Sequence, residues 1–410
     1  MQKADEPHLN VSQLLSHDDF KKFCEKNDIS PLIYEKSVEI PRFVRTIPST
    51  TETPTQVIGI VKKELEDRYK QDISIDSVSW IPEKFGFFQL SQDFNISQCE
   101  SYKNGKIYGI DISSAMAVFS LNPKPNEHVL DLCCAPGAKL CFIQDYVTLD
   151  NNKAQSVSLT GTDINLSRLH TCKTLLKKYK TLNTRLLLAD GTKYNCSVPP
   201  LRKEGRKIKK FLSRLYADGS DKNVLPDEIP DSGFVFYESP GVFTEMFREE
   251  QRIENTNKRR KIETPVVVGN SYPQLYDKVL VDAECSTDGS IKHLLKVLQG
   301  GWEVFNDRIL DQTRMNTITD LQKRLISNGF SLLKPDGVMV YSTCSLTRDQ
   351  NEGVVEWLLS NYKEAVVVEP FEDLKQVPYR EGKIKNTARL DPIVSNTSGL
   401  FIARIKRQIL

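Results

Sequence analysis

The chain has 410 residues, of which 39% are hydrophobic and 27% are charged. The length exceeds that of one average domain, and the apolar content is sufficient to bury a core. The formal net charge of +2 excludes a protein that binds nucleic acid through bulk positive charge, so any such affinity must come from local basic surface.

Targeting signals and metal motifs are not evident in the sequence. No apolar run approaches the about 20 residues that a membrane helix needs, and the first residues, MQKADEPHLNVS, lack the apolar core of a signal peptide. The nine cysteines are odd in number, and no two pairs of them have the spacing of a zinc ribbon. We therefore expect reduced thiols in an intracellular protein, with no metal and no membrane partner.

The first part of the chain predicts short, mixed elements. Residues 1–30 are expected to form a polar helical lead with Leu14, Leu15, Phe20 and Phe23 on its apolar face. Residues 31–106 alternate strand and helix signals and predict a small α+β unit. Its expected elements are a strand over 34–48, a helix over 53–70 capped by Thr55, and short strands over 77–82 and 86–90.

From residue 107 to 410 the pattern alternates apolar strands with amphipathic helices, which predicts a mostly parallel sheet of seven strands covered on both faces. The strands are expected over 128–133, 156–163, 184–190, 276–285, 337–344, 365–370 and 399–405, and the helices from Ala138, over 165–180 and over 316–328. Such sheets bind ligands at the carboxyl ends of their strands, where this sequence places Asp131, Asp163, Asp190, Asp282 and Cys344.

A charged stretch interrupts this alternation. Residues 195–270 are rich in Pro, Gly and charge, and their length predicts a partly disordered insertion in the α/β domain. The basic run at 258–261 has three interpretations that remain open: a nuclear address, a patch that binds phosphate, or a solvated charged loop.

The run Asp131-Leu132-Cys133-Cys134-Ala135-Pro136-Gly137-Ala138-Lys139 joins a strand to a helix through small residues. Such a turn lets a cofactor lie against the backbone and the helix N-terminus. The run lacks both G-x-G-x-x-G and G-x-x-x-x-G-K-[ST]. These are the motifs that would indicate a bound dinucleotide or nucleoside triphosphate, so neither ligand is favoured. S-adenosylmethionine, which has no phosphates, fits better. The candidate cofactor-binding residues are Cys133, Cys134, Ala135, Pro136, Gly137, Ala138, Lys139, Asp163, Asp190 and Asp282.

Two of these aspartates have specific expected roles. Asp163, at the end of one strand, can accept both ribose hydroxyls of an adenosyl group, and Asp190, at the end of the next strand, can meet the adenine edge. The alternative is that each aspartate caps the helix that follows its strand. Their joint placement with the turn at 133–139 favours the cofactor.

Two cysteines also follow predicted strands, Cys285 in DAECS and Cys344 in STCS. Adjacent parallel strands would bring both thiols to one edge of the sheet. Buried cysteines usually serve as small apolar residues, and we assign that packing role to Cys133, Cys134, Cys141 and Cys172. For Cys285 and Cys344, which have polar neighbours, we favour a chemical role.

Five segments of the chain resemble the successive motifs of the RNA 5-methylcytosine methyltransferases of the Sun/nucleolar-protein family. They are DLCCAPGAKL, GTDINLSRL, LLLADGT, VDAECS and YSTCSLTRDQNE, and the earlier IPRFVRTIP and the later SGLFIARIKR are also similar. The resemblance covers about residues 35–407, apart from the insertion. It implies an α/β, Rossmann-like methyltransferase domain at 107–410 and an RNA-binding role for the unit at 31–106, with Arg42 and Arg45 as candidate phosphate contacts.

The resemblance also implies a covalent mechanism with S-adenosylmethionine. The target cytosine would leave its stack, and the Cys344 thiolate would attack ring carbon 6 while Asp282 supports protonation at ring nitrogen 3. Cys285 would help to release the enzyme after carbon 5 is methylated. Lys139 would favour ionisation of the thiol if it faces the pocket; the alternative is a solvated lysine in the first turn of a helix.

The chain departs from the family pattern at three positions. Ala138 stands where the second glycine of a pair is usual, and Leu140 stands where threonine is usual. Glu284 replaces the proline that usually precedes the first cysteine, which places another carboxylate next to Cys285, the residue expected to act in the release step.

Two other classes of function remain open. A non-catalytic RNA-binding or ribosome-assembly factor would explain Glu284 and Ala138, and a methyltransferase acting on protein or small molecules would explain the turn but not the two cysteines. For an RNA enzyme we favour transfer RNA over ribosomal RNA as substrate, and we expect a monomer. The protein would be nuclear or nucleolar if the run at 258–261 is an address, and otherwise cytoplasmic; the sequence does not identify the cytosine.

Overall fold

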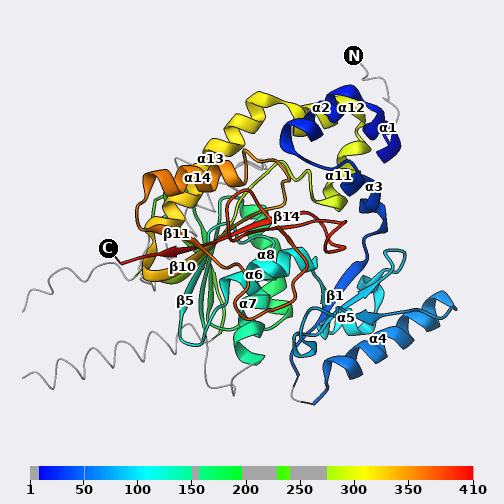
Figure 1. Cartoon of the computed structure of the whole chain (residues 1–410). Coiled ribbons are helices and arrows are strands. Elements are labelled where there is room, and N and C mark those ends of the chain that lie inside the picture. The colour runs from blue at the N-terminus through cyan, green and yellow to red at the C-terminus, as the bar shows by residue number, and fades with distance from the viewer. Residues whose placement is uncertain (1–8, 50, 150–156, 196–228, 241–274, 410) are drawn as a thin grey trace, which may run out of the picture. The chain divides into compact units, whose positions relative to one another are not determined.

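The computed structural model describes residues 9–49, 51–149, 157–195, 229–240 and 275–409 (Figure 1). The chain divides into two compact units. Unit 1 comprises Met1–Asn122, Val281–Ser327 and Val338–Leu410, and unit 2 comprises Pro123–Leu280 and Asn328–Gly337. Among the described helices, none is long and apolar enough to span a bilayer.

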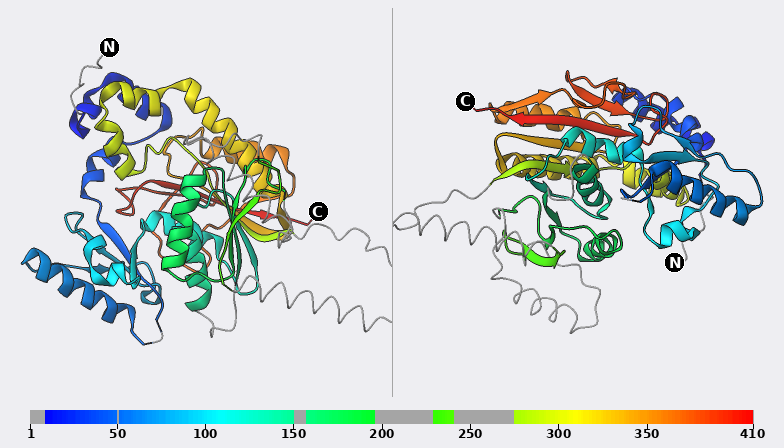
Figure 2. Two further views of the ribbon diagram at one scale, coloured as in Figure 1. Left: turned by 180° about the vertical axis from the view of Figure 1, so that it is seen from behind. Right: turned by 90° about the horizontal axis from the view of Figure 1, so that it is seen from below.

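Unit 2 contains the parallel strands. β5 (His128–Asp131), β6 (Ser158–Asp163), β7 (Thr184–Leu188) and β9 (Tyr276–Asp282) neighbour one another in the order β9-β5-β6-β7, and each pair is parallel. Helices α7 (Ala138–Leu149) and α8 (Leu166–Lys178) lie side by side, and α8 packs on β6 and β7 (Figures 1 and 2). All five residues of β7 are buried, as expected for a parallel strand covered on both faces. The predicted parallel sheet is confirmed.

One strand lies inside the predicted insertion. Residues 229–240 contain β8 (Phe234–Glu238), which pairs antiparallel with β7 and is held by an ion pair of 2.9 Å between Arg185 and Glu238. The prediction missed this edge strand because its short sequence, FVFYE, lies within a stretch rich in Pro, Gly and charge. Residues 196–228 and 241–274, including the basic run at 258–261, lie outside the described residues.

A four-stranded antiparallel sheet lies in unit 1. Its strands β1 (Arg42–Thr46), β2 (Asp76–Ser77), β3 (Phe87–Leu90) and β4 (Ile107–Gly109) neighbour one another in the order β2-β3-β1-β4. Helix α4 (Pro54–Tyr69) buries Val57, Ile58, Val61 and Leu65, each worth about 1.5–3 kcal/mol when fully buried, in a cluster with residues of β1 and β3. The remaining short elements here are η2 (Glu83–Phe85), η3 (Ile96–Gln98) and α5 (Glu100–Lys103).

Two details of this region differ from the prediction. The strand expected over 34–48 is limited to β1, because the preceding residues form α3 (Leu32–Lys36) and η1 (Ser37–Glu39). The cap of α4 is Thr53 rather than Thr55: Pro54 occupies the first helical position, and the Thr53 hydroxyl accepts the N–H of Gln56. The side chain of Gln56 accepts the N–H of Thr53 in return, which completes a capping box.

The N-terminal lead folds as part of unit 1. It forms α1 (Val11–Ser16) and α2 (Asp18–Asn27), whose buried Leu14 and Phe20 join one apolar cluster with Leu294 and Phe305. Those partners belong to α11 (Ile291–Leu298) and α12 (Gly301–Phe305), which η6 (Asn306–Leu310) and α13 (Gln312–Ser331) follow. The predicted apolar face is therefore confirmed at Leu14 and Phe20.

The C-terminal strands are antiparallel. β10 (Leu333–Thr343) pairs with β14 (Leu400–Arg407), which also pairs with β11 (Ala365–Val368) and β13 (Thr387–Leu390); β12 (Arg380–Glu381) pairs with β13. The helices here are α14 (Glu352–Asn361) and α6 (Ile112–Leu121), and α6 packs on β14. Among the described residues the sheet contains ten strands rather than the predicted seven, since the prediction did not include β8, β12 and β13. β8 and β12 lie at the two ends of the sheet, and β13 lies between β12 and β14.

Candidate active site

Cys285 and Cys344 come together in unit 1. Cys285 follows β9, Cys344 follows β10, and their Sγ atoms are 3.3 Å apart without a disulfide. Cys285 is buried and Cys344 is partly exposed. The structure thus brings together the two thiols that the sequence placed at neighbouring strand ends.

The environment of Cys344 holds its thiol in the protonated form. The hydrogen bond with Cys285 and burial raise the pKa of Cys344 well above its ordinary value, and the negative charges of Asp282 and Asp288 act in the same direction. Asp282, the last residue of β9, accepts a hydrogen bond of 2.7 Å from the Ser342 hydroxyl. Formation of a Cys344 thiolate therefore requires a compensating positive charge or a proton acceptor.

A buried carboxylate orders the segment after Cys344. Asp288 accepts the N–H of Leu346 at 2.9 Å and a hydrogen bond from the Ser286 hydroxyl, so it links the segments that carry the two cysteines. Burial raises the pKa of Asp288, although these hydrogen bonds act against the shift. The N–H of Gly289 donates to the Cys344 carbonyl oxygen at 2.9 Å. Asn351 donates to the carbonyl oxygen of Ser345 at 2.8 Å and accepts the hydroxyl of Thr343 at 2.6 Å.

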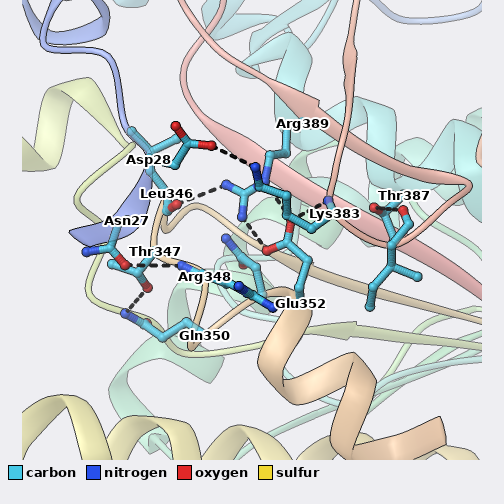
Figure 3. Close-up of polar contacts among 12 residues, drawn as sticks. Asn27, Asp28, Leu346, Thr347, Arg348, Gln350, Glu352, Lys383, Thr387 and Arg389 are labelled. Atoms are coloured by element: carbon cyan, nitrogen blue, oxygen red, sulfur yellow. Dashed lines mark hydrogen bonds and ion pairs between the residues drawn. The ribbon is translucent and has the colours of Figure 1, made fainter. Parts of the chain in front are cut away.

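An ion pair also contacts the segment after Cys344 (Figure 3). Glu352, at the start of α14, is fully buried and forms two hydrogen bonds with the guanidinium of Arg389 from β13. Arg389 also donates to the carbonyl oxygen of Leu346 at 2.9 Å, two residues after Cys344. Burial raises the pKa of Glu352, but the hydrogen bond and charge of Arg389 outweigh it and leave the pKa below its ordinary value.

The predicted cofactor turn lies in unit 2 between β5 and α7. The Cys134 N–H donates to the Thr162 carbonyl oxygen at 2.9 Å, and the Thr162 hydroxyl donates to the Leu132 carbonyl oxygen at 2.8 Å, so the turn is fixed to β6. Gly137 has a φ of 102°, and a Cβ there would lie 2.6 Å from the Cys172 sulfur. Only glycine fits this position without displacement of α8. Ala138 begins α7 and is partly exposed, so its methyl group is accommodated.

The other residues of the turn divide by exposure. Cys134, Cys141 and Cys172 are buried, with the sulfurs of Cys134 and Cys172 3.9 Å apart, as their packing role predicts. Cys133 and Lys139 are partly exposed, Pro136 is exposed, and Ala135 is buried. Lys139 is the second residue of α7, so it lies in the first turn of that helix.

Asp163 closes the turn rather than capping the next helix. Its carboxylate accepts the N–H groups of Ala135 at 3.4 Å and Asn165 at 2.9 Å, and it pairs with Arg168 at 3.5 Å. Burial raises its pKa in spite of these contacts. The cap of α8 is Asn165, which accepts the N–H of Arg168. The capping interpretation of Asp163 is therefore wrong.

Asp190 lies two residues beyond β7 and is partly exposed. Its Oδ1 accepts the N–H of Thr192 at 2.9 Å and the Thr192 hydroxyl at 2.8 Å, so these bonds orient its carboxylate within a local turn.

The two candidate phosphate contacts of β1 have different environments. Arg45 is fully buried, donates to Phe85 and Tyr108, and stacks on the rings of Phe87 and Tyr108. It is a core residue, so its prediction as a phosphate contact is wrong. Arg42 is partly exposed and lines a cavity of about 250 Å³, where it donates to the Gln92 carbonyl oxygen at 3.2 Å.

The described residues contain no group of three or more His, Cys, Asp or Glu side chains with the arrangement of a metal site. The sequence missed Asp288, Glu352 and Arg389, which support the segment after Cys344. Glu352 ends the YSTCSLTRDQNE motif, and this was the one available signal for it. Nothing near Arg389 in the sequence indicates its contact with Leu346.

The parallel strands, the turn after β5 and the thiol pair define a Rossmann-like methyltransferase fold. Two solved structures support this fold. A methyltransferase homologue from Pyrococcus horikoshii has a TM-score of 0.56 at 22% identity and covers 98% of each chain. NSun6 from Pyrococcus horikoshii with SFG has a TM-score of 0.59 at 14% identity and covers 95% of this chain and 97% of that one.

The chain belongs to the family described as 16S rRNA methyltransferase RsmB/F, whose model matches residues 118–203 and 250–406. It is 33% identical to ribosomal RNA small subunit methyltransferase F of Klebsiella pneumoniae over 141 residues, which are 34% of this chain and 28% of that protein. It is 24% identical over 352 residues to a tRNA (cytosine(49)-C(5))-methyltransferase of Pyrococcus abyssi, with 84% of each chain covered. The alignment thus spans less than a third of the first relative and most of the second.

Proposed function

We propose that this protein is an RNA cytosine-5 methyltransferase that uses S-adenosylmethionine and attaches its substrate covalently through Cys344. The observation that carries the proposal is the pair of reduced thiols, Cys285 and Cys344, 3.3 Å apart at the ends of two strands of a methyltransferase fold. A single nucleophile would require only one thiol. Two adjacent thiols suit a reaction in which one adds to a ring and the other assists its departure.

Cys344 would begin the reaction by losing its thiol proton to solvent and forming a bond from the thiolate sulfur to ring carbon 6 of an extruded cytosine. The displaced electron pair moves toward ring nitrogen 3, where Asp282 supports a proton, and carbon 5 becomes nucleophilic. S-adenosylmethionine, when bound, supplies an electrophilic methyl group for carbon 5. Cys285, after losing its own proton to solvent, then takes the carbon-5 proton as a thiolate. The C5=C6 double bond re-forms, and the Cys344 thiolate leaves carbon 6.

Cys344 is a protonated thiol in the free protein and must lose its proton before it can attack the ring. Because Cys285, burial and the nearby carboxylates raise its pKa, the free protein contains little Cys344 thiolate at neutral pH. We propose that Lys139, in the first turn of α7, faces the substrate pocket and supplies part of the compensating charge. Its replacement by methionine would then lower the rate of addition while leaving the fold intact.

The turn after β5 fits an adenosyl cofactor. Gly137 leaves no side chain on the backbone at the start of α7, and Asp163 and Asp190 follow the next two strands with carboxylates fixed by local hydrogen bonds. We assign the ribose to Asp163 and the adenine edge to Asp190. Cys133 to Lys139 would line the remaining part of the site, together with Asp282.

The substrate is proposed to be transfer RNA. The relative that aligns over most of its length is named for a tRNA cytosine, although a relative named for ribosomal RNA matches 34% of this chain. We propose that residues 31–106 bind RNA and that Arg42 contacts phosphate there. The protein would act as a monomer inside the cell, where its free cysteines stay reduced.

Transfer of a labelled methyl group to purified tRNA and rRNA tests the proposal. Wild-type protein should label tRNA, Cys344→Ala should label nothing, and Cys285→Ala should accumulate an RNA adduct that survives denaturation. Equal labelling by Cys344→Ala would contradict the assigned nucleophile. A folded protein that binds no S-adenosylmethionine in calorimetry would instead be a non-catalytic RNA-binding factor.

A further inference from the structure

The two peptide groups on either side of Cys285 are held by glutamine side chains. Gln322 of α13 donates through Nε2 to the carbonyl oxygen of Glu284 at 2.8 Å. Gln350 accepts the N–H of Ser286 through Oε1 at 2.9 Å. Both glutamines are at most 1% exposed. Cys285 therefore lies between two buried amides that fix its backbone from before and after.

The two glutamines also contact each other and the segment of the other cysteine. Nε2 of Gln322 lies 3.4 Å from Oε1 of Gln350, whose own Nε2 donates to the hydroxyls of Ser286 at 2.8 Å and Thr347 at 2.9 Å. Thr347 follows Cys344 by three residues. The hydroxyl of Tyr341 donates to the main-chain oxygen of Gln350 at 2.6 Å. One network thus connects the segments that carry both thiols.

Glu284 explains why this chain needs such support. A proline at this position would fix the backbone φ through its ring, whereas glutamate leaves φ free. The Glu284 side chain is exposed, so packing does not replace the lost restraint. The hydrogen bond from Gln322 to the Glu284 carbonyl oxygen instead restrains the peptide group between Glu284 and Cys285.

The side chain of Gln322 reduces the stability of the core. Its Oε1 is buried without a hydrogen-bond partner among the described atoms, and an unsatisfied buried amide oxygen disfavours folding. An apolar side chain of similar shape would avoid this cost. The contact of Nε2 with the peptide before Cys285 is therefore the feature that sets glutamine apart from methionine or leucine at this position.

We propose that Gln322 and Gln350 are positioning residues that hold Cys285 at the carbon-5 proton during enzyme release, in place of the restraint that a proline at 284 would supply. This inference rests on the proposed function. Proton transfer requires the sulfur within hydrogen-bond reach of the proton, so a small displacement of Cys285 slows release. The addition of Cys344 and the methylation of carbon 5 need no contact from Cys285 and stay fast.

The experiment uses the full chain with a tRNA transcript and measures three quantities: single-turnover methyl transfer, steady-state turnover, and the fraction of protein in a denaturation-stable RNA adduct. Gln322→Met should reduce turnover by about tenfold and raise the adduct fraction, with single-turnover methylation within about twofold of wild type. Gln322→Glu, which also removes the donor, should behave alike. Asp320→Asn, an exposed site on the same helix, is the matched control and should behave as wild type.

A second substitution separates positioning from a general defect. Glu284→Pro should restore turnover and remove the adduct in the Gln322→Met background, while changing the wild-type background little. Wild-type turnover in Gln322→Met, or a parallel loss of single-turnover methylation and turnover without adduct, would overturn the proposal. In the same assay Cys285→Ala must form adduct and Cys344→Ala must not; failure of that pair would refute the proposed function itself.

Discussion

The N–H of Gly289 donates to the carbonyl oxygen of Cys344 at 2.9 Å, and a Cβ at Gly289 would lie 2.7 Å from that same oxygen. The main chain at Cys344 therefore contacts the main chain at Gly289, four residues after Cys285. The arrangement leaves no room for a side chain, because the opposing atom is main chain and cannot rotate away.

Gly289→Ala should therefore displace Cys344. We expect a loss of methyl transfer of about 100-fold for a shift near 1 Å, with a stability cost of about 1–3 kcal/mol from overpacking. Methyl-transfer kinetics and urea unfolding measure the two effects. Gly353→Ala is the control, since a Cβ there would lie 3.5 Å from its nearest neighbour. Equal activity of both variants would show that the Cys344 segment has another support.

The Glu352–Arg389 pair makes a prediction about stability. Arg389→Met leaves a fully buried carboxylate without its cation and should cost about 3–5 kcal/mol in the free energy of unfolding. The double variant Glu352→Gln/Arg389→Met should cost less than Arg389→Met alone, because no charge is left unpaired. Chemical denaturation of the four proteins in this cycle gives the coupling energy. Additive effects would contradict a direct pair.

The same pair predicts a pH dependence. The pKa of Glu352 in the folded protein is lowered from its ordinary 4.5, so the pair's contribution is fully present above pH 4.5 and is lost as the pH falls through the folded-state pKa. Wild type should therefore lose more stability than Glu352→Gln between neutral pH and the acid limit of folding. Parallel stability curves for the two proteins would show that Glu352 does not titrate with folding.

The raised pKa of Cys344 predicts slow reaction with iodoacetamide at neutral pH, with a rate that increases with pH. Since the hydrogen bond with Cys285 is the largest cause of the raised pKa, Cys285→Ala should lower the pKa of Cys344 and make Cys344 react faster at pH 7.5. Mass spectrometry of the Cys344 peptide follows the reaction. Cys24, whose pKa burial raises to about 12, is an internal standard that should stay unmodified. A slower reaction in Cys285→Ala would contradict the assigned cause.

Substitutions of Thr53 and Thr55 test which of the two residues caps α4. Thr53→Ala removes the side-chain acceptor of the capping box and should cost about 1 kcal/mol in thermal or chemical unfolding. Thr55→Ala, two residues inside the exposed end of the helix, should cost less. The reverse order would place the cap at Thr55.

The convergence of Asp282, Cys285 and Cys344 was predictable because the rule that links parallel strands to ligand sites needs only strand ends, and both strands are strongly apolar. Gln322, Arg389 and Asp288 were not predictable, because each acts through a contact with main chain far away in the sequence. Arg45 was misassigned since a charged residue near a strand end gives no sign of the Phe87 and Tyr108 rings that cover it.

The raised pKa of Cys344 has a protective consequence. Peroxides oxidise thiolates far faster than thiols, so a sulfur that keeps its proton is a poor substrate for conversion to sulfenic acid. Cys344 would then be open to oxidation only during turnover, while its thiolate is present, and the free protein would keep this thiol reduced under oxidative stress.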